Sequence, residues 1–330
     1  MVPAISVLPL WLSAGIALQF QTTGQATAPA KSGPELYQSA CAACHGSDGK
    51  GLPEAVVGFR TPVPDFSDCS FATPEPDADW LAVVHGGGPM RAFDRMMPAF
   101  GDLLSDTEMQ SIVGHVRTFC TSSHWPRGEL NFPRALFTEK AFPENEAVWT
   151  MTVASHETRS IGNEFLYEQR IGARSQFEVV VPIEFQQAEG QPWRRGLGDL
   201  AVAFKRVLYH DLGSGTIVSA AGEVIFPTGK EDLGLGNGLT VFEPFVAVGQ
   251  ALPADAFFQV QAGVELPADG DAASEAFWRV TGGKSFFEGR FGRSWSPMVE
   301  VLGARELEDV AATTWDVVPQ LQVTLSRRQH

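Results

Sequence analysis

The residues whose type and spacing point most directly to chemistry are cysteines, of which the sequence has four. Cys41 and Cys44 are separated by two alanines and followed at once by His45. Two thiols at this spacing lie on one helical turn, where they can add to the two vinyl groups of haem, and the adjacent imidazole then faces the iron. The motif predicts covalent attachment of one haem c, with His45 as an axial ligand of the iron.

Other chemistry is known for cysteine pairs at this spacing. A structural zinc site of this kind needs further cysteine or histidine ligands at matching spacing, and the sequence has no second Cys-x-x-Cys. A thioredoxin-like redox centre needs a βαβ pattern around the motif, and none surrounds it. Both are weaker interpretations than haem attachment.

Short helices must position the haem motif. Ser32-Gly33-Pro34-Glu35 has the pattern of a capping box with proline in the first turn, which predicts a helix that runs into Cys41. Residues 79–85 predict a second helix, which a run of glycines ends. Another capping box, Ser105-Asp106-Thr107-Glu108, begins a third helix, whose apolar face is formed by Met109, Ile112, Val113, Val116 and Phe119.

The order of these features resembles class I cytochrome c over residues 33–120. The matching stretches are Gly-Pro-Glu-Leu-Tyr before the motif, Cys-His-Gly-x-Asp-Gly at its end, and Met-Pro-Ala-Phe-Gly in a late loop. In that family the methionine before the proline is the sixth iron ligand, which implies Met97 here; Met96 and Met90 lie nearby, and His85 is a competitor. Histidine–methionine ligation raises the haem potential and closes the iron to substrates. The resemblance implies an electron-transfer domain over residues 31–120.

Cys69 and Cys120 are left over from the haem motif. An even, spare pair in an exported domain favours a disulfide. It would tie the loop after residue 65 to the end of the last helix. The alternative is two buried free thiols.

The N-terminus and the charge favour an exported protein. Residues 1–28 read as a signal peptide, with an apolar core followed by small residues, although no basic residue precedes Lys31; a buried N-terminal helix is the alternative. The formal net charge of −15 argues against a nucleic-acid partner. After residue 20 no apolar run is long enough for a membrane-spanning helix.

Residues 121–146 contain several prolines and predict a linker, with one helical turn near residues 135–140. From residue 147 onward, apolar residues alternate with period two and no longer with helical periodicity. About ten strands of roughly 9–11 residues follow, long enough to cross an outer membrane at a tilt. Long polar connections, such as 187–196 and 228–238, alternate with shorter ones, as in outer-membrane barrels. The strands are expected near residues 147–155, 163–171, 175–186, 197–208, 216–227, 239–250, 257–266, 275–286, 294–305 and 313–325.

The polar face of these strands is rich in Gln, Glu and Gly, which suits a water-filled lumen, whereas a soluble β-sandwich or jelly roll is the alternative. The sequence therefore predicts an all-α class I cytochrome c domain followed by an antiparallel transmembrane β-barrel at 147–330. Such barrels usually end on an aromatic residue, and this chain ends in Arg-Arg-Gln-His. We therefore expect an incomplete barrel that lacks one or more C-terminal hairpins.

The barrel region also resembles a known family. Gly196-Leu197-Gly198-Asp199-Leu200 and Glu223-Val224-Ile225-Phe226-Pro227-Thr228-Gly229 are similar to the outer-membrane barrels of the MetA pathway of phenol degradation. Members of that family are thought to be channels, so the resemblance implies a membrane location and leaves the substrate open.

Three functions are consistent with this organisation. The first is electron transfer at or across the outer membrane, in an arrangement similar to fused cytochrome–porins, with periplasmic redox proteins and outer-membrane lipid as partners; Fe²⁺ oxidation would be a further activity. The second is a transport channel with a haem domain that senses or docks a redox partner. The third is a periplasmic electron-transfer protein with a soluble β-domain, which membrane insertion would exclude.

Overall fold

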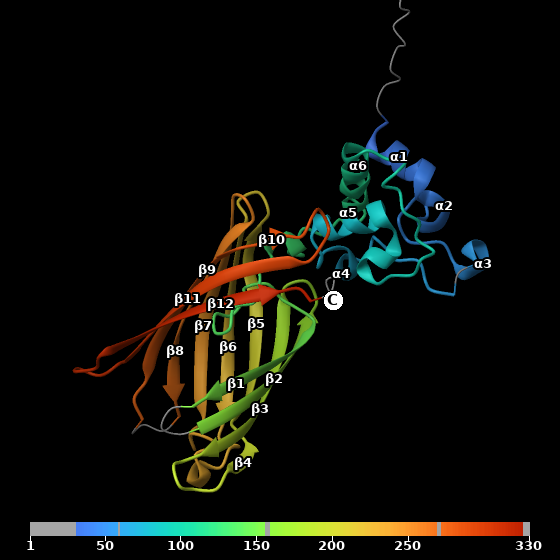
Figure 1. Ribbon diagram of the computed structural model, residues 1–330. Helices are drawn as coiled ribbons and strands as arrows, with labels where there is room; N and C mark the ends of the chain where they lie inside the picture. Colours follow the sequence, from blue (N-terminus) through green and yellow to red (C-terminus); the bar gives the residue numbers. More distant parts are fainter. Residues whose placement is uncertain (1–30, 59, 156–158, 269–271, 326–330) are drawn as a thin grey trace, which may run out of the picture. The chain divides into compact units, whose positions relative to one another are not determined.

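A helical region and a large antiparallel sheet follow one another along the chain (Figure 1). The computed structural model describes residues 31–58, 60–155, 159–268 and 272–325. The predicted signal peptide, 1–28, lies outside the described residues. Within the described ranges, no helix combines the length and the apolar character needed to cross a membrane.

The helical region contains short helices joined by long loops, as the two capping boxes predict. Both form: the Ser32 and Glu35 side chains cap the first helix, and the Ser105 and Glu108 side chains cap the last. The elements are α1 (Gly33–Ala40), α2 (Ala42–His45), α3 (Glu54–Val57), α4 (Cys69–Ala72), α5 (Asp77–Gly86), η1 (Gly88–Arg91) and α6 (Asp106–Arg117), followed by η2 (Gly128–Leu130).

The first and last helices of this region pack closely together. At Gly33 a Cβ atom would lie 2.2 Å from the Ser111 carbonyl oxygen, so only glycine permits this approach of α1 to α6. The apolar face of α6 is buried, as its 3.6-residue spacing predicts. The core around it contains Leu36, Tyr37, Ala42, Phe66, Ile112 and Val116, with Val84, Met109 and Val113 alongside.

The second half of the chain is one antiparallel sheet that curls around an interior (Figure 1). All ten strands predicted from the alternation form, and their ends differ from the predicted ones by four residues or fewer. They are β1 (Glu146–Ala154), β2 (Arg159–Ile171), β3 (Ser175–Gln187), β5 (Leu200–Asp211), β6 (Thr216–Phe226), β7 (Val241–Leu252), β8 (Ala256–Pro267), β9 (Glu275–Lys284), β11 (Ser294–Glu306) and β12 (Thr313–Val323).

The sheet has two further short strands and two free edges. β4 (Arg194–Leu197) pairs with β3, and β10 (Phe286–Phe287) pairs with β11. A short helical turn, η3 (Glu231–Leu233), lies in the long loop after β6. Consecutive long strands are neighbours in the sheet, and within the described residues no pairing joins β1 to β12. The fold is a cytochrome-like helical region followed by a barrel-like antiparallel sheet.

The two faces of the sheet reverse the usual distribution of polarity. Polar side chains point to the interior, where Glu168, Lys205 and Glu300 are almost fully buried. Large apolar side chains point outward and are exposed. Examples from β1, β2, β3, β5, β7, β9, β11 and β12 are Trp149, Phe165, Tyr167, Phe177, Phe204, Phe242, Val246, Val280, Val299 and Trp315.

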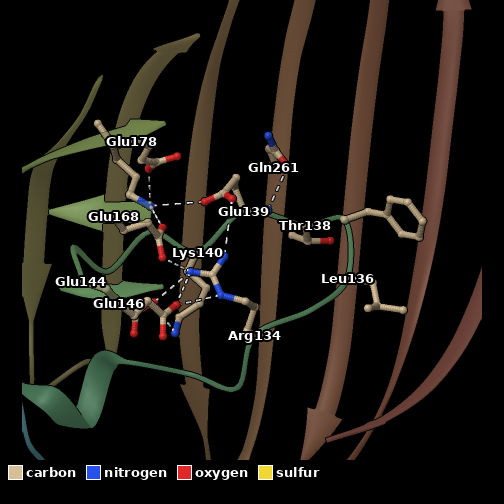
Figure 2. A network of polar contacts seen from close by, with 12 residues as sticks. Arg134, Leu136, Thr138, Glu139, Lys140, Glu144, Glu146, Glu168, Glu178 and Gln261 are labelled. Carbon is tan, nitrogen blue, oxygen red and sulfur yellow. Dashed lines mark hydrogen bonds and ion pairs between the residues drawn. The ribbon is translucent and has the colours of Figure 1, made fainter. Parts of the chain in front are cut away.

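The region predicted as a linker, 121–146, has a different place in the structure. Its residues 130–144, which we call the lumen segment, run along the inner face of the sheet (Figure 2). No helical turn forms at 135–140. Prolines and mixed charges made the stretch resemble a linker, but its apolar side chains join the interior core. That core contains Leu130, Phe132, Ala141 and Phe142 from the segment's side, and Val207, Ile217, Phe245, Ala247, Phe257, Phe277 and Met298 from the strands.

Candidate haem site

The Cys-x-x-Cys-His motif lies on a tight turn of helix. Helix α1 ends at Cys41, and α2 carries the rest of the motif to His45. The loop that follows folds back onto it, because the Leu52 N–H donates to the Cys44 carbonyl oxygen at 2.9 Å. The Tyr37 hydroxyl adds a hydrogen bond to the Gly46 carbonyl oxygen at 2.8 Å. Both thiols are free and partly exposed, so they remain available for thioether bonds.

The imidazole of His45 has the properties that an iron ligand needs. Burial lowers the pKa of His45 to about 4, so the ring is neutral and can offer a lone pair to a metal. Its Nδ1 atom is buried and has no hydrogen-bond partner among the described residues. The ring stacks on Phe66 at 4.7 Å between centroids. A neutral imidazole with a buried, unpartnered Nδ1 atom, next to two free thiols, fits a covalently bound haem.

Met97 lies in a loop that backbone hydrogen bonds hold against the end of α5. The Gly88 N–H donates to the Met97 carbonyl oxygen at 3.1 Å, and the Gly101 N–H donates to the His85 carbonyl oxygen at 2.9 Å. Gly87 has a φ of +78°, and a Cβ atom there would lie 2.8 Å from the Met97 carbonyl oxygen. Only glycine combines this backbone conformation with such a close approach, so Gly87 fixes the path of the loop.

The competitors for the sixth ligand position differ from Met97 in their surroundings. Met97 is half-buried, whereas Met96 is 49% exposed. The side chain of Met90 packs on Gly86, and the ring of His85 packs on Gly101. Met97 stays a prediction, as do the alternatives Met96, Met90 and His85.

Cys69 and Cys120 form a disulfide with a Cα–Cα distance of 5.1 Å. It joins α4 to the residues after α6, two segments whose sequence separation is 51. We expect the Cys69→Ser, Cys120→Ser double variant to lose about 4 kcal/mol of unfolding free energy, because the unfolded chain regains the entropy of an open loop. Thermal unfolding of the haem-loaded protein, compared with a Ser70→Ala control, measures this loss. Equal stability of the two variants would contradict it.

A polar network inside the sheet has no counterpart in the sequence analysis (Figure 2). The guanidinium of Arg134 pairs with Glu144 at 3.2 Å, with Glu139 at 3.8 Å, and with Glu146 and Glu168 at closer range. A second cation, Lys205, pairs with Glu178 at 3.2 Å and with Glu139 at 3.3 Å, and Lys140 pairs with Glu144 at 2.6 Å. The sequence signal for this network is charge complementarity. Two cations, Arg134 and Lys140, lie in one short segment, and acidic residues occupy inward-facing positions of the strands.

These carboxylates are close enough together to be considered as a metal site. Glu139, Glu168 and Glu178 form one group, and Glu144, Glu146 and Glu168 form another. In both groups a protein cation already lies among the oxygens: Lys205 in the first and Arg134 in the second. The arrangement is an internal ion-pair network that attaches the lumen segment to the sheet.

The helical region and its Cys-x-x-Cys-His turn define a cytochrome c domain, followed by an antiparallel sheet. The family model for cytochrome c oxidase, cbb3-type, subunit III matches residues 28–116, which covers α1 to α5, η1 and all of α6 except its last residue, and none of the sheet. No curated protein matches the chain significantly. The domain therefore carries covalently bound haem c, which supplies a reversible one-electron couple at its iron. Cys41, Cys44 and His45 are the residues that would hold it.

Proposed function

We propose that this protein is a monohaem c-type cytochrome joined to an outer-membrane barrel, and that it transfers electrons at the outer membrane. The haem domain would lie in the periplasm and exchange electrons with periplasmic redox proteins. Cys41 and Cys44 would form the thioether bonds, and His45 and Met97 would be the axial ligands. This ligand set would leave no iron position open for oxygen or peroxide.

The reversed polarity of the sheet is the observation that carries the membrane part of this proposal. A soluble β-sandwich buries its apolar face and exposes its polar face, whereas here large apolar and aromatic side chains are exposed and Glu, Gln and Lys are buried. β1, β2 and β3 have 9 to 13 residues and are therefore long enough to cross a membrane at a tilt. Between β2 and β8, turns of three or four residues, at 172–174, 212–215 and 253–255, alternate with the longer connections at 188–199 and 227–240.

The barrel resembles the MetA-pathway family only in short motifs, so we propose no transported substrate. A transport channel is the less favoured function, because the lumen segment lies along the inner face of the sheet. The resemblance to fused cytochrome–porins supports electron transfer at the membrane.

A charge on the outer face tests the membrane location. Val246 lies in the middle of β7, is 45% exposed, and has Ala220 and Ala262 as its cross-strand neighbours. We expect Val246→Arg to destabilise the folded barrel in lipid by about 2–4 kcal/mol, the cost of a basic residue near the bilayer midplane. The measurement is urea unfolding in vesicles, read from gel mobility with and without boiling.

Ala188→Arg, in the exposed loop after β3, is the matched control and should have no such effect. The wild-type protein should appear in the outer-membrane fraction as a band that stains for covalent haem and changes mobility on boiling. A haem band confined to the soluble periplasm, with Val246→Arg as stable as Ala188→Arg, would overturn the membrane proposal.

A further inference from the structure

The inward-facing polar side chains in one part of the barrel are dry. In an open aqueous pore such side chains would contact water, and the middle of the lumen would be accessible. Here Gln176, Ser219, Gln261, Thr281 and Glu300 have no measurable exposure, although they belong to different strands around the sheet. Part of the protein must therefore cover them from inside.

The lumen segment, residues 130–144, provides that cover. Its polar groups form hydrogen bonds and ion pairs with residues on most of the strands. Arg134 pairs with Glu146 on β1 and Glu168 on β2, and the Glu144 N–H donates to Gln176 on β3. Further bonds join the segment to Lys205 on β5, Ser219 on β6, Gln259 and Gln261 on β8, Thr281 on β9, Glu300 on β11 and Gln320 on β12.

One attachment involves the backbone of the segment directly: the Glu300 carboxylate accepts from three consecutive backbone N–H groups. The distances are 3.2 Å from Leu136, 3.2 Å from Phe137 and 2.7 Å from Thr138. The Thr138 hydroxyl donates to the same carboxylate at 2.7 Å, and the Gln320 amide donates to it at 2.6 Å. A buried carboxylate needs such donors, and the extended segment needs acceptors for its N–H groups. Each satisfies the other.

Apolar contacts close the space beside this polar layer. Phe132 stacks on Phe257 with ring centroids 5.7 Å apart, and Leu130, Ala141 and Phe142 are buried among strand residues. Burial of these large side chains stabilises the closed arrangement. The segment is thus bound by its side chains and by its backbone.

We propose that residues 130–144 form an intrinsic plug that closes the barrel to ions and small solutes, with Glu300 as the residue that holds it in place. The inference rests on the proposed function, because closing the barrel affects the cell only if the barrel spans the outer membrane. It explains how a barrel could anchor a haem domain in the outer membrane without making that membrane leaky. The closure depends on a short segment of this chain and requires no separate plug domain.

Ion flux through the reconstituted full-length protein tests the closure. Wild-type protein in vesicles loaded with KCl should leak no faster than empty vesicles. Glu300→Ala leaves the Phe137 and Thr138 N–H groups without their acceptor, and leaves the Leu136 N–H with Gln320 alone. It should increase the leak at least about tenfold, because the plug then opens locally. Glu184→Ala is the matched control, since Glu184 is an inward-facing strand residue with no hydrogen bond or ion pair to the plug among the described residues.

Thiol labelling tests the plug independently of the membrane. With haem attached and the Cys69–Cys120 disulfide formed, an added cysteine is the only reactive thiol. Ala141→Cys, at a position 2% exposed, should react with a maleimide at least about 100-fold more slowly than Ala188→Cys on the surface. Adding Glu300→Ala should remove most of that difference.

The two measurements separate the possible failures. Wild-type vesicles that conduct freely, or an Ala141→Cys thiol that reacts as fast as Ala188→Cys in a folded, haem-loaded protein, would overturn the plug. A Glu300→Ala variant that inserts and stays tight, with Ala141→Cys still protected, would overturn the assignment to Glu300. Failure of the wild-type protein to enter vesicles, with slow labelling retained, would overturn the membrane proposal and leave the plug standing.

Discussion

Replacement of Met97 by leucine is expected to lower the reduction potential of the haem by on the order of 100 mV or more, within the ~0.8 V that axial ligation spans. A neutral thioether ligand stabilises ferrous over ferric iron, and leucine has no atom that can replace it. Covalent haem content should stay unchanged, because Cys41 and Cys44 are untouched. A potentiometric titration followed by haem absorbance measures the shift.

Carbon monoxide binding connects this change to the iron. The open sixth position of Met97→Leu should bind carbon monoxide in the ferrous state, and the wild-type protein should not. Met96→Leu is the matched control, because Met96 is the neighbouring thioether and is 49% exposed. If Met96→Leu or His85→Leu lowers the potential and Met97→Leu does not, the ligand assignment is wrong.

The haem domain could be predicted from sequence because its signals are local. The thiols and imidazole of the motif are neighbours on one helical turn, and each capping box lies within four residues. The loop around Met97 is less local, since Gly87 and Met97 meet through backbone contacts ten residues apart in sequence. The resemblance to class I cytochrome c, and not spacing, led to that residue.

The strands were also predictable, because alternation with period two is a property of each strand by itself. That pattern shows which residues face inward and does not show what the inward face contacts. A water-filled lumen was therefore expected. The contact between Glu300 and Thr138 spans 162 residues of sequence, and no local pattern encodes such a pairing.

The composition of the lumen segment predicts a linker, because its few aromatic residues and its cations point to opposite environments. Phe132 and Phe142 are too few to predict a buried element, and Arg134 and Lys140 suggest a solvated surface. Their partners are inward-facing carboxylates of the barrel, so the charges become complementary only after the sheet has formed.

The largest loss of stability that we expect comes from removing the cation at the centre of this ion-pair network. Arg134→Met should reduce the unfolding free energy of the barrel by about 3–5 kcal/mol, because it leaves buried carboxylates without their cation. Glu168 is the most affected, since its side chain is fully buried and its ion pair with Arg134 is among the closest in the protein. Urea unfolding of the reconstituted protein, read from gel mobility, measures the loss against the exposed control Arg305→Met.

A second substitution distinguishes charge from packing as the cause. Because the cost of Arg134→Met comes from uncompensated negative charge, Glu168→Gln in the same chain should recover about 0.5–3 kcal/mol of it. If packing of the guanidinium stem were the cause, the two losses would add. Arg134→Met that is as stable as Arg305→Met would show that the carboxylates of Glu144, Glu146 and Glu168 do not depend on this cation. The plug would then be held by Glu300 and the apolar contacts of Phe132 and Phe142 alone.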